Sequence, residues 1–211
     1  MQFFKYALAA LSFGSAIAMP ASQPEDRALN VKGVITDLAA VKALVSAVSS
    51  IKVNIEVDLG ALEDILNGTV TTQVVPTLQT TLESVRTEVL SIEAKVDPLL
   101  QGTIKPLAQD ELDVVLDLLN DVVALVNGIE ATINDLLQSL PADVLKTVQS
   151  ELTFVLATLN PAIQPILDLV LGLVGAQTGG VVAEINGLIN TLNGLLGGLL
   201  NGLLGTVVGI L

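Results

Sequence analysis

Few side chains in this sequence are suited to acid–base or metal chemistry. The 211 residues include no cysteine and no histidine, which removes the commonest general base, the Ser-His-Asp and Cys-His arrangements and ordinary zinc sites. Carboxylates remain, as the adjacent pairs Glu63-Asp64 and Asp110-Glu111. Neighbouring side chains on a helix point in different directions, whereas an acid–base pair needs one buried carboxyl group. We therefore expect no catalytic residue, no cofactor and a non-enzymatic protein.

An acidic stripe is the one candidate metal site. Asp110, Asp113, Asp117 and Asp121 fall on one side of a predicted helix at about 100° per residue. Calcium prefers carboxylate oxygens, but its sites usually need a loop that wraps the ion. We interpret the stripe as a solvated face and expect no metal, with a calcium site as the alternative.

The composition excludes further classes of partner. The net charge of −13 repels phosphate backbones, so we expect no nucleic-acid partner. Phe154 is the only aromatic residue beyond position 13, and stacking on bases or sugar rings needs aromatic platforms. Hydrophobic residues make up 51% of the chain, which is typical of a strongly buried, folded protein rather than a disordered one.

The N-terminus is typical of a secretory signal peptide. Lys5 precedes an apolar stretch that ends in Ala16-Ile17-Ala18, an A-x-A cleavage pattern. We expect cleavage after Ala18, a polar leader over residues 19–27 and a secreted protein. The alternative, an N-terminal membrane anchor, is disfavoured because the stretch is shorter than the roughly 20 residues of a span.

Apolar residues then recur in steps of three and four, which predicts an all-α fold. We expect an antiparallel helical bundle of about five to six helices, with a parallel coiled coil as the alternative. Residues 28–174 form the predicted bundle domain, and the helix rich in Asp110–Asp121 is expected at its centre because it is apolar on most sides. The expected helices cover 31–66, 78–99, 112–140, 141–159 and about 162–174, with Pro141 and Pro161 in the first helical position of the last two.

The C-terminal segment, residues 175–211, is rich in glycine and leucine. After a GAQTGG linker, its leucines recur on one predicted helix face, opposite Gly194, Gly198 and Gly202. Interior glycines each cost about 1 kcal/mol relative to alanine, so this helix needs a partner surface. Four interpretations remain open: a last bundle helix, a surface-seeking segment, a transmembrane span or a signal for a GPI anchor. The expected apolar surface-binding residues are Leu188, Leu192, Leu195, Leu196, Leu199, Leu200, Leu203 and Leu204.

One glycosylation sequon is present. Asn67-Gly68-Thr69 lies at a predicted turn between helices in a chain expected to be secreted, so Asn67 is the predicted N-glycosylation site. The alternative is an unused sequon whose Asn-Gly serves the turn alone.

Together these features resemble a known family. A signal peptide, the leader MPASQPEDR and a cysteine-free aliphatic domain that begins VKGVITDLAAVKALVSAV resemble the fungal hydrophobic surface-binding protein A family, which includes the antigenic cell wall galactomannoproteins. The resemblance covers about residues 28–160 and leaves the Gly/Leu segment outside. It implies a small helical bundle of the cell wall that adsorbs to hydrophobic surfaces or holds fatty acids, with no catalytic residues to carry over. We expect such a secreted, wall-associated protein; a wall- or membrane-linked structural protein, with GPI processing, is the alternative.

Overall fold

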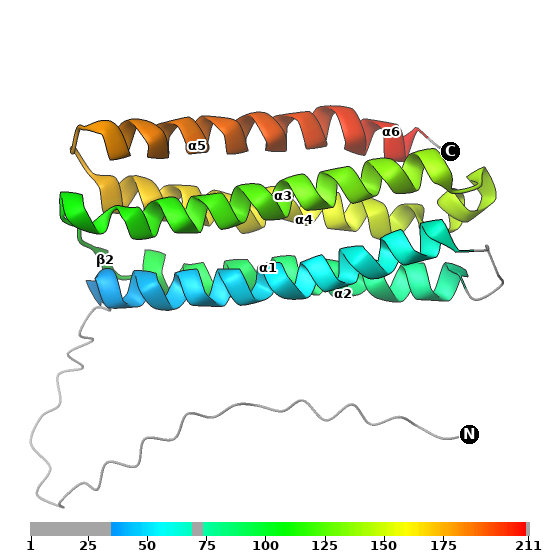
Figure 1. Cartoon of the computed structure of the whole chain (residues 1–211), viewed down its shortest axis with the longest axis horizontal. Coiled ribbons are helices and arrows are strands. Elements are labelled where there is room, and N and C mark those ends of the chain that lie inside the picture. Colours follow the sequence, from blue (N-terminus) through cyan, green and yellow to red (C-terminus); the bar gives the residue numbers. More distant parts are fainter. Residues whose placement is uncertain (1–34, 69–73, 210–211) are drawn as a thin grey trace, which may run out of the picture. The chain divides into compact units, whose positions relative to one another are not determined.

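The computed structural model describes residues 35–68 and 74–209. The predicted signal peptide, its cleavage site after Ala18 and the polar leader lie outside these residues, as do Val31 and Val34 of the first predicted helix. The described part is an all-α bundle, as the apolar spacing predicts (Figure 1). Its main helices are α1 (Leu38–Asn67), α2 (Val74–Leu100), α3 (Asp113–Ser139), α4 (Ala142–Val174) and α5 (Gly180–Gly198).

Short elements connect and extend these helices. The two-residue strands β1 (Ile35–Thr36) and β2 (Thr103–Ile104) pair in parallel, and the 3-10 turn η1 (Gln109–Glu111) precedes α3. After α5 the chain continues through a π-helical turn, η2 (Leu199–Leu203), into α6 (Leu204–Val208). We call the continuous segment Gly180–Val208 the C-terminal helix.

Helix α1 begins later than the sequence pattern indicates. The carboxylate of Asp37 accepts a 3.0 Å hydrogen bond from the backbone N–H of Ala40, which satisfies one of the free donors in the first turn. From Leu38 the helix runs unbroken to Asn67.

The expectation of two helices over residues 142–174 is wrong, because α4 is one helix with Pro161 and Pro165 inside it. Each proline lacks the N–H that would bond the carbonyl four residues earlier, which affects Ala157 and Pro161. Both of these residues are exposed, so water can solvate their carbonyl oxygens. Pro141 is likewise the N-cap residue rather than the first helical residue.

Consecutive helices alternate in direction, yet α1 and α3 lie side by side in parallel (Figure 1). Lys52 of α1 meets Asp121 of α3. Further along both helices, a Cβ added at Gly128 would lie 3.3 Å from Cδ1 of Leu59. Because the residue numbers of the contacting positions rise in the same direction along both helices, the two helices run parallel.

Helices α2 and α4 form the second parallel pair. The amide of Gln79 donates to Glu151, and further along both helices Arg86 lies over the ring of Phe154. The core between these pairs is aliphatic: every buried hydrophobic residue of the described part is Val, Leu, Ile or Ala. Packing of aliphatic side chains therefore carries the stability of the bundle.

Candidate functional site

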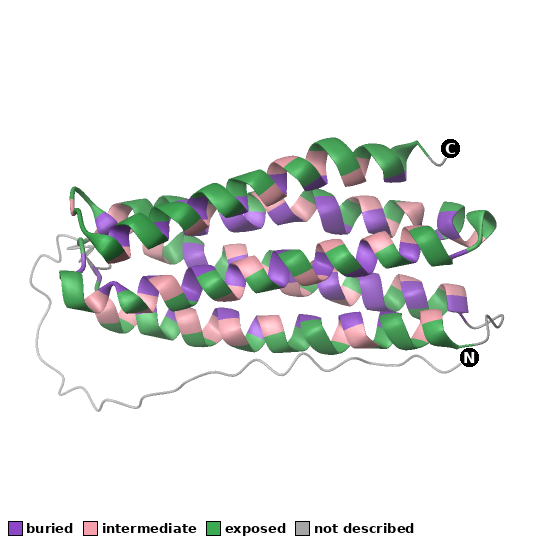
Figure 2. Ribbon diagram, turned by 45° about the horizontal axis from the view of Figure 1, so that its top comes forward, coloured by how far each residue is buried: buried purple, intermediate pink, exposed green. Residues whose placement is uncertain are grey.

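The C-terminal helix lies over α3 and α4, and its leucine face points inward (Figure 2). Leu192, Leu196 and Leu199 are 0%, 3% and 1% exposed. The remaining predicted surface-binding leucines are partly buried: Leu188, Leu195, Leu200, Leu203 and Leu204. All eight leucines except Leu200 are buried in the core or packed against it, on the side of the helix that faces the bundle.

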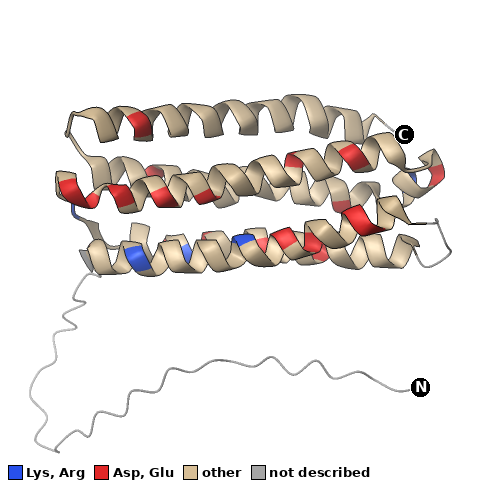
Figure 3. Cartoon of the chain, in the orientation of Figure 1, with Lys and Arg blue, Asp and Glu red and all other residues tan. Residues whose placement is uncertain are grey.

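The outer face of this helix is small and almost uncharged. Gly194, Gly198 and Gly202 are exposed, and a Cβ added at any of them would meet no atom within 4 Å. Glu184 is the one charged residue after position 168 (Figure 3). These glycines weaken the helix without serving a close contact inside the described part of the chain.

The C-terminal helix is packed on one side. In its most apolar 18-residue window 28% of residues are buried, the same share as in α1 and less than the 50% in α4. The π-helical turn η2 widens the helix, and Val207 beyond it returns to the buried face at 0% exposure. The helix is therefore attached to the bundle along one narrow aliphatic face.

Polar contacts hold both ends of the helix. At the far end, the amide of Gln149 in α4 donates to the carbonyl oxygens of Val207 and Val208 at 2.8 and 3.4 Å. At the near end, the amide of Gln177 donates to the carbonyl oxygen of Leu107. Residues 175–179 between α4 and α5 form the connecting turn.

The predicted acidic stripe is mostly solvated. Asp110, Asp113 and Asp117 are exposed, and the described residues contain no group of three or more potential ligands arranged to hold a metal ion. Asp121 instead accepts hydrogen bonds from Ser49 and, at 2.9 Å, from Lys52. The hydrogen bond to Asp121 raises the pKa of Lys52, and the negative charges of Asp121 and Glu56 add to this effect. Desolvation of the ammonium group by partial burial acts in the opposite direction. One residue of the stripe, Asp121, therefore links α3 to α1 through these hydrogen bonds.

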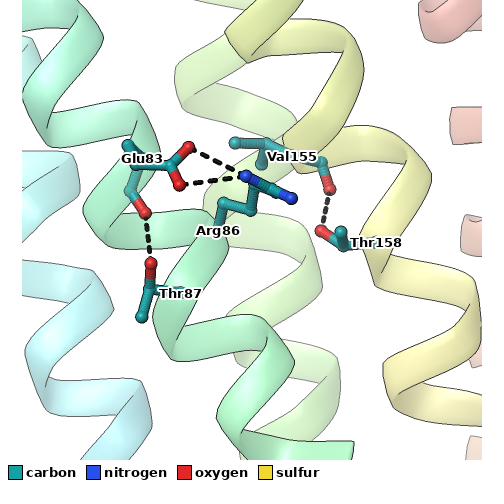
Figure 4. A network of polar contacts seen from close by, with 5 residues as sticks. All are labelled: Glu83, Arg86, Thr87, Val155 and Thr158. Carbon is teal, nitrogen blue, oxygen red and sulfur yellow. Dashed lines mark hydrogen bonds and ion pairs between the residues drawn. The ribbon is translucent and has the colours of Figure 1, made fainter.

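A second set of polar contacts lies where α2 and α4 face each other, and each hydrogen bond of this set stays within its own helix (Figure 4). Arg86 Nη1 lies 2.9 and 3.1 Å from the two carboxylate oxygens of Glu83, and its guanidinium carbon is 5.1 Å from the ring centroid of Phe154. The hydroxyl groups of Thr87 and Thr158 donate to carbonyl oxygens of their own helices. This geometry is a surface cation–π pair, with the half-exposed Phe154 covered on one side.

Asn67 is the last residue of α1 and is exposed. It borders a surface hollow lined also by Glu63, Leu66, Asp135 and Ser139. An exposed asparagine at a helix end is accessible to modification, while Thr69 of the sequon lies outside the described residues. The adjacent carboxylate pair Glu63-Asp64 is exposed as well.

Among residues 35–68 and 74–209, three helices are long and apolar enough to cross a membrane, judged by length and composition: α1, α4 and the C-terminal helix. The fold thus defines a class, an all-α bundle of aliphatic helices. No protein-family model, curated protein or solved structure matches the chain.

Sequence reasoning missed the residues that attach the C-terminal helix. Gln149 and Gln177 are ordinary polar residues in the sequence, and their role appears only when α4, the turn and the C-terminal helix are placed together. The glycines of the linker indicated a turn. They did not indicate which of these glycines has a positive φ.

Proposed function

We propose that this is a secreted, non-enzymatic protein that binds hydrophobic surfaces or lipids at the fungal cell wall or cell surface. The observation that carries the proposal is the C-terminal helix, whose leucines face inward while glycines and asparagines cover its outer side. In the docked position the bundle itself is the partner of the leucine face. Binding an external apolar phase requires the helix to leave α3 and α4 and turn this face outward.

The free energies support such an exchange. Apolar area moved out of water contributes about 2.5 kcal/mol per 100 Å², and it does so whether the covering surface is the bundle or a wax. Undocking therefore exposes the leucine face of the C-terminal helix to water, and adsorption covers this face again. Adsorption also covers the aliphatic surface of α3 and α4 that the helix leaves. Interior glycines weaken the helix itself by about 1 kcal/mol each relative to alanine, so its formation depends on a covering surface, which either the bundle or an apolar phase supplies.

The rest of the molecule is compatible with this mechanism. The chain has no cysteine, so no disulfide ties the helices together. The net charge of −13 keeps copies apart in solution, and the charges lie almost entirely outside the C-terminal helix (Figure 3). The resemblance to the hydrophobic surface-binding protein A family supports the same function.

A second candidate is a wall- or membrane-linked structural protein with a processed C-terminus. It is favoured by one observation, the length and hydropathy of Gly180–Val208, which suffice for a membrane span. Mass spectrometry of the native C-terminus separates the two candidates. An intact C-terminal Leu211 contradicts GPI processing, and a truncated chain carrying a glycolipid contradicts our first candidate.

Adsorption to octyl-coated beads tests the proposal. We expect the double substitution Leu195→Asn and Leu203→Asn on the inner face to reduce the adsorbed amount several-fold. The control makes the same chemical change in α1, with Val53→Asn and Val57→Asn, because these valines are 55% and 68% exposed. Equal losses in both variants would contradict a specific role of the C-terminal helix.

A further inference from the structure

The turn between α4 and the C-terminal helix depends on glycine at two positions. Gly175 has φ of 59° and Gly179 has φ of 143°, a region that other residues rarely adopt. A Cβ at Gly179 would lie 2.7 Å from Nε2 of Gln109, and one at Gly175 would lie 3.1 Å from Cγ of Pro106. Glycine also adopts extended backbone freely, so the same five residues can straighten.

The turn allows the C-terminal helix to dock on α3 and α4 of its own chain. Leu192, Leu196 and Val207 are buried, and Gln149 bonds the last turn of the helix. None of these contacts requires the helix and the α3–α4 surface to belong to the same chain. The same helix from a second copy would make each of them without any new complementarity.

We propose that two copies of this chain associate by exchanging their C-terminal helices, so that each helix docks on α3 and α4 of the other copy. The inference rests on the undocking used in the proposed function. A straightened turn of five residues spans up to about 17 Å, so the C-terminal helix of one copy can extend away from its own α4 toward α3 and α4 of the other.

The net charge of the whole chain keeps copies apart, but the local charges at the exchanged helix and at the nearby end of the bundle oppose a second copy only weakly. The exchanged helix carries Glu184 as its one charge, so it approaches another acidic molecule with little repulsion. The end of the bundle near the turn also carries both signs, with lysines on α1 and α2 and aspartates at the start of α3 (Figure 3). Lys42 and Lys95 have no ion pair within the described part of the chain, which leaves them available to Asp110 or Asp113 of a second copy.

Concentration decides between the closed and the exchanged form. A short linker gives the chain's own helix an effective concentration in the millimolar range, so the closed monomer prevails in dilute solution. Exchange becomes favourable where the protein is concentrated, as in a layer of adsorbed molecules. There it would link neighbouring copies.

The test uses Gly175→Ala and Gly179→Ala in the full-length secreted chain. Each alanine strains the backbone of the closed turn but fits the straightened turn without strain. An exchanged dimer contains two straightened turns, so the strain is relieved at both. We expect the dimer dissociation constant, measured by sedimentation equilibrium, to fall at least about tenfold for each substitution. Gly187→Ala is the matched control, because its Cβ meets open space and should leave the constant unchanged.

A second measurement identifies which chain supplies the helix. Cysteines introduced by Gln149→Cys and Val208→Cys are unique in this chain, and a short bis-maleimide joins them. Denaturing electrophoresis of the dimer fraction should show two chains linked together. Links confined to one chain in that fraction, or a monomer at every concentration in the alanine variants, would overturn the proposal. Both measurements are made in solution without an apolar phase, so their failure is distinguishable from a failure to adsorb.

Discussion

The side-chain amide of Gln149 in α4 lies 2.8 Å from the carbonyl oxygen of Val207, 58 residues further along the chain. The last carbonyl groups of a helix have no partner within it, and this contact satisfies one of them. It also attaches the end of the C-terminal helix that is farthest from the turn at 175–179. Undocking from that end must break it.

We first predict that Gln149→Ala loosens the far end of the C-terminal helix. Loss of one hydrogen bond corresponds to about 1 kcal/mol, so amide hydrogen exchange in residues 199–208 should accelerate about fivefold. The matched control is Gln164→Ala, since Gln164 lies on the same helix and bonds Asp168 within it. Equal exchange rates in the two variants would show that Gln149 does not hold the helix.

The second prediction concerns the outer glycines. Gly187→Ala and Gly194→Ala should each raise the free energy of unfolding by up to about 1 kcal/mol, because alanine favours the helix and both positions face open space. Chemical denaturation checks the change. A decrease instead would indicate that another surface covers this face in solution.

The third prediction is an alkaline loss of stability through Lys52. Its pKa is raised in the folded state by the hydrogen bond to Asp121, so the contribution is complete below the unfolded value of about 10.4. It is lost as the pH rises through the folded pKa. Lys52→Gln should therefore destabilise the protein by about 1 kcal/mol near neutral pH and by less at strongly alkaline pH.

Denaturation of both proteins across the alkaline range measures this effect. Lys42→Gln serves as the control, because Lys42 is exposed and forms no ion pair with the described residues. A deficit for Lys52→Gln that stays constant with pH would contradict the assignment.

The fourth prediction tests docking of the leucine face in solution. Leu192 is 0% exposed, so Leu192→Ala should destabilise the protein by about 2–5 kcal/mol. Val57→Ala, at a position that is 68% exposed, should stay within about 0.5 kcal/mol of the wild type. A similarly small change for Leu192→Ala would mean that the C-terminal helix is not packed on the bundle.

Apolar periodicity was sufficient to predict the helical fold and which side of the C-terminal helix is apolar, but not that this side docks on the bundle. Leu192, Leu196 and Leu199 follow helical spacing, and any docked helix must turn that side toward its partner. The length of α4 was not predictable in the same way. Pro161 and Pro165 are local signals for a break, and burial of Ile163 and Ile166 at 0% exposure outweighs them.

Contacts between distant segments were also beyond the sequence pattern. The parallel pairing of α1 with α3 brings Lys52 to Asp121, but the periodicity of each helix does not say which helices become neighbours. The same holds for Gln149 and Val207. Such pairs depend on tertiary placement, and the local spacing of either partner carries no sign of it.

Adsorption by a chain whose C-terminal helix is locked tests the central claim most directly. Gln149→Cys and Val208→Cys, joined in the monomer by a short cleavable bis-maleimide, hold the helix on the bundle. We predict that the locked protein adsorbs to octyl-coated beads several-fold less than the same protein after cleavage of the link. Equal adsorption before and after cleavage would contradict a mechanism that turns the leucine face outward.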